Sequence, residues 1–175
     1  MTAEERRADI LLRLQSAAAP LSATALSEQY GVSRQVIVGD IALLRAAGAK
    51  IHATPRGYTL PHSEPGGLLR TIACVHDEAQ TEQELCILVD NGCTVRDVIV
   101  EHPIYGQLTG VLELRSRYDV SRFLELSAKA APLCSLTDGV HLHTLICPDE
   151  AALLRVRQQL DAAGILLPDA GDGNE

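Results

Sequence analysis

The apolar residues of the first sixty positions recur with the period of amphipathic helices. Three helices are predicted, over about 3–17, 22–29 and 33–47. In the third helix Ile37, Ile41 and Leu44 share one face, and Ser33 can cap the first turn. Two short strands, over about 49–51 and 58–60, follow and are joined by a turn that contains Arg56. This order of helices, tight turn and hairpin predicts a winged helix-turn-helix.

From about residue 68 the pattern changes to alternating strands and helices. Strands are predicted at about 69–76, 94–101, 107–114, 133–136 and 140–147, and helices at about 81–91, 119–130 and 149–163. Thr81, Asp119 and Ser121 are candidate helix caps, and Gly92 and Gly164 fit the C-terminal ends of helices. The pattern predicts an α+β fold, an α/β sandwich with helices on one face of a mainly antiparallel sheet.

A break separates the two patterns. Residues 61–67 contain two Pro and two Gly, which neither a helix nor a central strand tolerates well. We therefore predict a winged helix-turn-helix domain at 1–60, a linker at 61–67, the sandwich domain at 68–168 and a flexible acidic tail at 169–175.

Composition narrows the class of protein. Apolar residues make up 46% of the 175 residues, which is enough for a buried core, whereas aromatic residues make up only 3%. The low aromatic content argues against modules that stack bases of single-stranded RNA. No apolar run reaches the roughly 20 residues of a membrane span, the N-terminus is not a signal peptide, and the five Cys form no Cys-x-x-Cys pair. We expect a cytoplasmic protein with reduced thiols and no membrane partner.

Charge is distributed unevenly along the chain, whose net charge is −8. Residues 1–60 carry seven Lys and Arg against five acids, whereas the remaining residues carry eight against eighteen. Because an acidic surface repels nucleic acid, we expect double-stranded DNA to contact the N-terminal third alone.

The predicted third helix is the second helix of the helix-turn-helix, the one that enters the major groove of DNA as the recognition helix. Packing its apolar face inward turns Gln35 and Val38 outward, with Arg34 on the flank. Gln35 can pair with adenine, Arg34 can reach guanine or a phosphate, and Arg56 at the wing tip can contact a phosphate or the minor groove. The alternative is a small helical domain with ordinary surface residues. The predicted DNA-binding residues are Ser33, Arg34, Gln35, Val38 and Arg56.

Three histidines and a glutamate of the second domain are spaced so that they could bind one metal ion. His141 and His143 point to the same face of a predicted strand, since side chains alternate along a strand. His76 ends another strand, and Glu84 lies one turn into the next helix. Three nitrogens and one carboxylate oxygen suit Zn²⁺, Ni²⁺, Mn²⁺ or Fe²⁺ without selecting among them. Two surface histidines on a strand are the alternative interpretation of the His-x-His pair.

Several other residues could bind a small ligand or take part in catalysis, but each also has an ordinary structural interpretation. His102 and Tyr105 lie at a Pro- and Gly-containing break between two strands, where His102 can also be an ordinary turn residue. Arg117 precedes a helix and can bind a small carboxylate, or simply pair with Asp119. No nucleophile elbow, phosphate-binding loop or His-Glu-x-x-His motif is present, so the sequence offers little support for an enzyme. Cys74 shares the strand face of His76, and a buried thiol is its ordinary interpretation.

Taken together, these segments resemble a known family, the niacin-responsive transcriptional repressors of bacterial NAD synthesis and niacin uptake genes. The segments that carry the resemblance are 32–38, 40–41, 44–45, 51–54, 56–58, 75–77, 84–85, 100–106, 116–120 and 139–143. Members join a winged helix-turn-helix to a three-histidine (3H) domain. Gly39 departs from the larger, often polar residue expected at that position.

The resemblance implies a homodimeric repressor that binds operator DNA, with nicotinic acid as co-repressor and a divalent transition metal in the 3H domain. It implies that the metal ligands are His76, Glu84, His141 and His143, and that His102, Tyr105 and Arg117 contact the effector. A metal-responsive regulator is the alternative, followed by a metal-dependent hydrolase fused to a DNA-binding domain.

Overall fold

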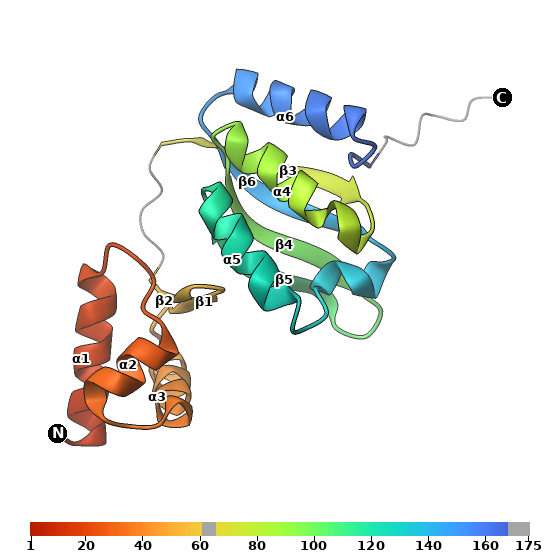
Figure 1. Cartoon of the computed structure of the whole chain (residues 1–175). Coiled ribbons are helices and arrows are strands. Elements are labelled where there is room, and N and C mark those ends of the chain that lie inside the picture. Colours follow the sequence, from red (N-terminus) through yellow and green to blue (C-terminus); the bar gives the residue numbers. More distant parts are fainter. Residues whose placement is uncertain (61–65, 168–175) are drawn as a thin grey trace. The chain divides into compact units, whose positions relative to one another are not determined.

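The computed structural model describes residues 1–60 and 66–167. It divides into two compact units, 1–63 and 64–175 (Figure 1). The division falls within the predicted linker, of which residues 61–65 lie outside the described part, as does the predicted tail. No helix in the two described ranges combines the length and apolar character that a membrane span requires.

Unit 1 has three helices followed by a hairpin, as predicted. The elements are α1 (Ala3–Ser16), α2 (Ala23–Tyr30), α3 (Arg34–Ala46), β1 (His52–Thr54) and β2 (Gly57–Thr59). Ser22 and Ser33 cap α2 and α3, because each hydroxyl accepts a hydrogen bond from a backbone N–H in the first turn. Gly31 ends α2 in the left-handed conformation that glycine adopts without strain.

The core of unit 1 holds α3 against the other two helices. Its most buried side chains are Ile10, Leu14, Leu26, Ile37 and Ile41. The predicted inward face of α3 is therefore confirmed. Asp40 is also buried, and its carboxylate accepts a hydrogen bond from Arg6 Nε at 2.7 Å and a longer one from Arg7 at 3.5 Å. This pairing ties α1 to α3 and leaves the opposite face of α3 exposed.

The wing hairpin is present, and its second strand lies within one residue of the predicted position, but its first strand lies three residues later than predicted. Its strands pair from His52 with Thr59 to Thr54 with Gly57, so the predicted strand at 49–51 is wrong. The backbone of Leu21 pairs with Tyr58 through two hydrogen bonds of 2.8 and 2.9 Å, which fixes the position of the hairpin. The periodicity of so short a segment cannot reveal this tertiary contact.

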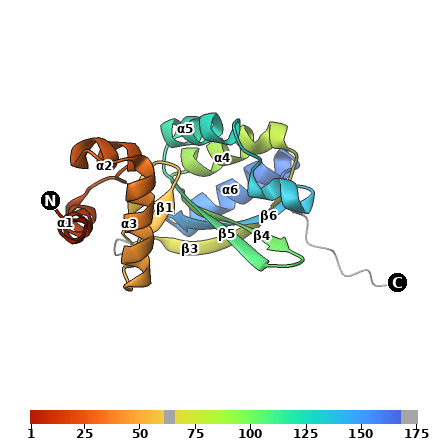
Figure 2. The same cartoon turned by 90° about the horizontal axis from the view of Figure 1, so that it is seen from below.

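Unit 2 contains a four-stranded antiparallel sheet in the order β3-β6-β4-β5. The strands are β3 (Leu68–Val75), β4 (Thr94–His102), β5 (Gly106–Leu114) and β6 (Val140–Cys147). The helices α4 (Thr81–Asp90), α5 (Arg117–Ser127) and α6 (Glu150–Ala162) all lie on one face of the sheet (Figures 1 and 2). The predicted α+β class and antiparallel sheet are thus confirmed. The core lies between these layers and includes Leu85, Leu88, Val95, Leu114, Leu145, Val156 and Leu160.

Two local predictions for unit 2 are wrong. The segment 133–136 is a 3-10 helix, η2 (Leu133–Thr137), rather than a strand. Pro132 precedes it with a fixed φ and no N–H, and Asp138 ends it in a left-handed conformation. Helix α5 begins two residues earlier than predicted because the Ser116 hydroxyl accepts from the Asp119 N–H and so caps the helix.

Candidate functional site

The predicted DNA-binding residues of α3 lie together at its N-terminal end. Arg34, Gln35 and Val38 are exposed, whereas the hydroxyl of Ser33 caps the helix. Arg56 lies in the turn between β1 and β2 and is partly buried. Because the first turn of α3 projects two polar side chains to solvent, it can meet base edges in a major groove.

A second candidate site lies inside unit 2, where two strands and a helix bring together His76, Glu84, His141 and His143. His141 and His143 face the helices from β6, His76 follows the last residue of β3, and Glu84 lies in the first turn of α4. Each of the four residues is at most 7% exposed. The expectation that His141 and His143 share one strand face is met, and the interpretation as two surface histidines is wrong.

The three imidazole rings converge on the carboxylate of Glu84. The Nε2 atoms lie 2.7 Å (His76), 3.0 Å (His141) and 3.4 Å (His143) from a Glu84 oxygen. The rings of His76 and His143 both pack edge-on against His141, with centroids 4.9 Å apart. Four potential ligand atoms thus surround one small volume.

Backbone carbonyls fix the orientation of each ring. The Nδ1 atoms of His76, His141 and His143 lie 2.6, 2.8 and 2.7 Å from the carbonyl oxygens of Asp77, Gly139 and Asp97. Since a carbonyl oxygen only accepts, each Nδ1 donates, and the lone pair of a neutral ring is on Nε2. Histidines that bind metal are oriented in this way by their second nitrogen.

Departures from regular strand geometry explain the position of two of these carbonyl groups. Asp97 follows a β-bulge in β4, which turns its carbonyl toward His143. Gly139 has a φ of +87°, and a Cβ atom there would lie 2.1 Å from the carbonyl oxygen of His76. Glycine is therefore required where the chain passes close to His76 and turns into β6.

The electrostatics of the cluster centre on Glu84. Burial alone would raise the pKa of Glu84, but attraction to His143 and hydrogen bonds from the three rings hold that pKa well below its usual range. Burial likewise opposes the charged form of His76 and His143, yet the Glu84 carboxylate raises the pKa of both. If all three Nε2 atoms bonded Glu84 through protons, three buried positive charges would face one negative charge, which is costly. A divalent ion in place of those protons fits the donor set better.

The sequence did not single out the two thiols near this cluster as part of it. The ligand atoms of Cys74, Glu84 and His141 all lie within 4.8 Å of one another. Burial and the charge of Glu84 raise the pKa of Cys74, and burial and Glu84 likewise raise the pKa of Cys134 in η2. The cross-strand pairing of Cys74 with His141 is the signal that could have revealed the first thiol, but it requires the strand register.

The structure does not bring His102, Tyr105 and Arg117 into this cluster. His102 and Tyr105 lie at the turn between β4 and β5, where the two rings stack with centroids 4.9 Å apart. His102 Nδ1 accepts from the backbone N–H groups of Ile104 and Tyr105. Arg117 donates two hydrogen bonds, of 2.8 and 2.6 Å, to Asp90 at the end of α4. Its ion pair is thus with Asp90, where the sequence suggested Asp119.

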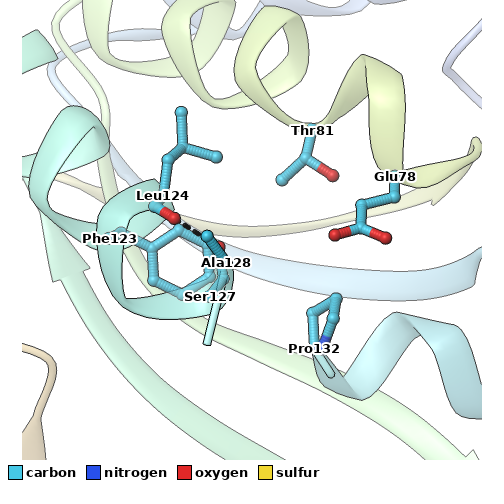
Figure 3. A pocket seen from close by; sticks show the side chains of 7 residues that line it. All are labelled: Glu78, Thr81, Phe123, Leu124, Ser127, Ala128 and Pro132. Atoms are coloured by element: carbon cyan, nitrogen blue, oxygen red, sulfur yellow. Dashed lines mark hydrogen bonds between the residues drawn. The ribbon is translucent and has the colours of Figure 1, made fainter. Parts of the chain in front are cut away.

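A small cavity, with a volume of about 130 Å³, lies between the start of α4, the C-terminal part of α5 and Pro132. Figure 3 shows Glu78 and Thr81 facing the residues of α5 and Pro132 across it. Thr81 is on the same side of α4 as Glu84, since residues three apart are neighbours on a helix. The Thr81 hydroxyl is buried and has no hydrogen-bond partner among the described residues. The full lining is Glu78, Thr81, Phe123, Leu124, Ser127, Ala128 and Pro132.

A winged helix-turn-helix followed by a domain with a buried ligand-type cluster defines the class of two-domain transcription regulators. Residues 6–59 match the HTH domain family and residues 69–169 match the 3H domain family. The chain is 45% identical over 169 residues to the transcription repressor NadR of Bacillus subtilis, with 94% of each chain covered. It is 42% identical over 168 residues to the probable transcription repressor NiaR of Thermotoga maritima, with 95% of each covered. The chain belongs to this family of repressors with an HTH and a 3H domain, which confirms the resemblance seen in the sequence.

Proposed function

We propose that this protein represses genes of NAD biosynthesis or niacin uptake, with nicotinic acid as co-repressor and a divalent metal ion in the 3H domain. The observation that carries the proposal is the convergence of three buried Nε2 atoms on Glu84, each ring being held by a backbone carbonyl at Nδ1. His76, Glu84, His141 and His143 would hold the ion. The ion would supply positive charge and an open position for the carboxylate or ring nitrogen of the effector.

The cavity that Thr81 lines, one helical turn from Glu84, is the place we propose for the effector. Its wall of Phe123, Leu124 and Pro132 suits one face of a small aromatic ring, and the unpartnered Thr81 hydroxyl can donate to a carboxylate. Glu78 lines the same cavity and would repel an anion, so a bound carboxylate needs the positive charge of a cation nearby.

The assignment of His102, Tyr105 and Arg117 to the effector stays a separate proposal. The first two lie at a hairpin turn, and Arg117 pairs with Asp90 at the far end of α4 from Thr81. Thr81 and Asp90 are nine positions apart in α4, which is about 13.5 Å along the helix at roughly 1.5 Å per residue. Thr81→Val and Arg117→Gln therefore distinguish the two sites, because the first removes the hydroxyl of one site and the second removes the positive charge of the other.

We propose operator binding through α3 and the wing of a homodimer. One α3 presents few side chains able to contact bases, and Gly39 adds none. Two copies that bind half-sites together multiply the affinity. The acidic remainder of the chain, with eight Lys and Arg against eighteen acids, would not contact the DNA.

The test is a titration of the full-length protein onto its own upstream DNA, followed by fluorescence anisotropy. Nicotinic acid, nicotinamide, Zn²⁺, Ni²⁺ and a chelator are added separately. We expect nicotinic acid to tighten DNA binding in the metal-loaded protein, nicotinamide to have no effect, and the chelator to abolish the response. Thr81→Val should weaken the response, and Arg117→Gln should leave it unchanged.

Three other outcomes would replace the proposal. If the ion alone changes the DNA affinity, the protein is a metal-responsive regulator, for which the buried cluster would be the sensor. If no addition changes the DNA affinity, the effector assignment is wrong. Consumption of nicotinic acid during the titration, measured by chromatography, would point to an enzyme with a fused DNA-binding domain.

A further inference from the structure

We propose that Cys74 is an additional ligand of the ion in this cluster, and that its sulfur makes the site select soft metals such as Zn²⁺ over hard ones such as Mn²⁺. The inference rests on the proposed function in one respect, since it requires that the cluster bind an ion. It goes further by assigning a fifth residue to the site and by narrowing the class of metal.

The position of Cys74 follows from the register of the sheet. Cys74 in β3 is the direct cross-strand partner of His141 in β6, as Ile72 is of His143. Cross-strand partners point to the same face, so the thiol lies beside the His141 ring on the side of Glu84. The Cys74 sulfur, a Glu84 oxygen and a His141 nitrogen lie within 4.8 Å of one another, and Cys74 is fully buried.

This distance is longer than one ion imposes on its ligands. Sulfur lies about 2.3 Å and nitrogen about 2.1 Å from Zn²⁺, so two ligands of one ion are at most roughly 4.4 Å apart. Binding of the ion would have to draw the sulfur inward, by a rotation of the Cys74 side chain or a small shift of β3. On coordination the S–H proton leaves to solvent and the ion takes its place on sulfur.

The sulfur ligand would change which metal ions the site prefers, which the nitrogen and oxygen ligands alone do not do. The set of three imidazoles and a carboxylate suits several divalent ions, including Mn²⁺ and Fe²⁺. Thiolate favours Zn²⁺ and other soft ions and disfavours Mn²⁺. A simple hydrogen bond from the Cys74 thiol to Glu84 would orient the carboxylate but would not produce this preference.

Cobalt(II) provides a direct probe, because it replaces zinc and reports its ligands by absorption. We titrate Co²⁺ into the full-length, metal-stripped protein and record the visible d–d bands and the near-ultraviolet sulfur-to-cobalt band. We expect both in the wild type. Cys74→Ser should lose the sulfur band while keeping the d–d bands, and its affinity for Zn²⁺ should fall at least tenfold with little change for Mn²⁺.

Cys134→Ser is the matched control, since that thiol is also partly buried in unit 2 but lies in η2, outside the group of Cys74, Glu84 and His141. It should keep the sulfur band. Cys74→Ala, with circular dichroism of both variants, separates loss of the ligand from loss of the fold. Visible d–d bands without a sulfur band in the wild type would overturn the role of Cys74 and leave the metal site standing. Failure to bind Co²⁺ at all would overturn the metal site itself.

Discussion

At the scale of single residues, His141 and His143 carry two of the four expected ligand atoms of the buried cluster. We predict that His141→Ala combined with His143→Ala removes stoichiometric metal from the purified protein, because only His76, Glu84 and the proposed ligand Cys74 remain, and two of the three imidazoles that would hold the ion are lost. Elemental analysis after dialysis measures the metal content. His102→Ala is the matched control, since it removes an imidazole at the β4–β5 turn and should not change the metal content.

Retention of one equivalent of metal by the double variant would show that the ion binds elsewhere in the chain. A decrease in His102→Ala as large as in the double variant would show that the hairpin turn, rather than the buried cluster, contains the ligand.

Gly139 supports the cluster without contributing a side chain. Its backbone has a φ of +87°, its carbonyl accepts from His141 Nδ1, and a Cβ atom would lie 2.1 Å from the His76 carbonyl oxygen. We predict that Gly139→Ala lowers the free energy of unfolding by at least about 2 kcal/mol and weakens metal binding, because His76 and His141 must both move. Denaturant titration with and without added Zn²⁺ measures both effects.

Gly106→Ala is the control for Gly139→Ala. It separates the effect of backbone strain from the effect of the steric clash with the His76 carbonyl. Gly106 also has a positive φ, of +68°, but a Cβ atom at this position would meet nothing within 4 Å. That substitution should cost only about 1–2 kcal/mol and leave the metal affinity unchanged. Equal effects of the two substitutions on metal affinity would contradict the role given to Gly139.

At the scale of elements, α3 contains a glycine in its exposed middle. A Cβ atom at Gly39 would meet nothing within 4 Å, so packing within the unit does not require the glycine. We predict that Gly39→Ala raises the free energy of unfolding by about 1 kcal/mol and weakens operator binding, because the glycine lets the backbone of α3 approach DNA closely. Thermal unfolding and fluorescence anisotropy measure the two effects. Ala42→Gly, at another exposed position of α3, should instead lower the stability by a similar amount.

A rise in both stability and operator affinity would show that Gly39 has no role at the DNA surface. The helix would then simply tolerate the residue.

The elements that the sequence predicts well are those with strong local signals. Ser22 and Ser33 cap helices, and the apolar stripe of α3 faces the core, because caps and periodicity act within a few residues. The predictions for the first wing strand and the segment 133–136 are wrong, because these conformations depend on the pairing of Leu21 with Tyr58 and on Pro132.

The same distinction applies within the buried cluster. The period of a strand places His141 and His143 on one face, so their proximity can be predicted from the sequence. The carbonyl partners of the rings cannot be predicted in this way, since they depend on the β-bulge just before Asp97 and on the positive φ of Gly139. The period of a strand also places Cys74 on the face of His76, but its position beside His141 depends on the register between β3 and β6, which local patterns do not specify.

At the scale of the whole molecule, we propose that unit 1 binds operator DNA and unit 2 binds the effector and the metal ion. The unit that holds α3 has seven Lys and Arg against five acids over residues 1–60, and the remainder of the chain is strongly acidic. DNA therefore favours the first unit, whereas the buried cluster and the cavity belong to the second. Repression controlled by an effector then requires that binding in one unit change binding in the other.

Such coupling must be reciprocal, because it is a single free energy shared by two ligands. If nicotinic acid tightens operator binding by a given factor, saturating operator DNA must tighten nicotinic acid binding by the same factor, typically about 5- to 150-fold, or about 1–3 kcal/mol. Isothermal titration of nicotinic acid into metal-loaded protein, with and without operator DNA, measures the second factor. DNA of scrambled sequence is the control, since it shares the phosphate charge but not the half-sites. Unchanged affinity on the operator would mean that nicotinic acid does not control the DNA-binding unit.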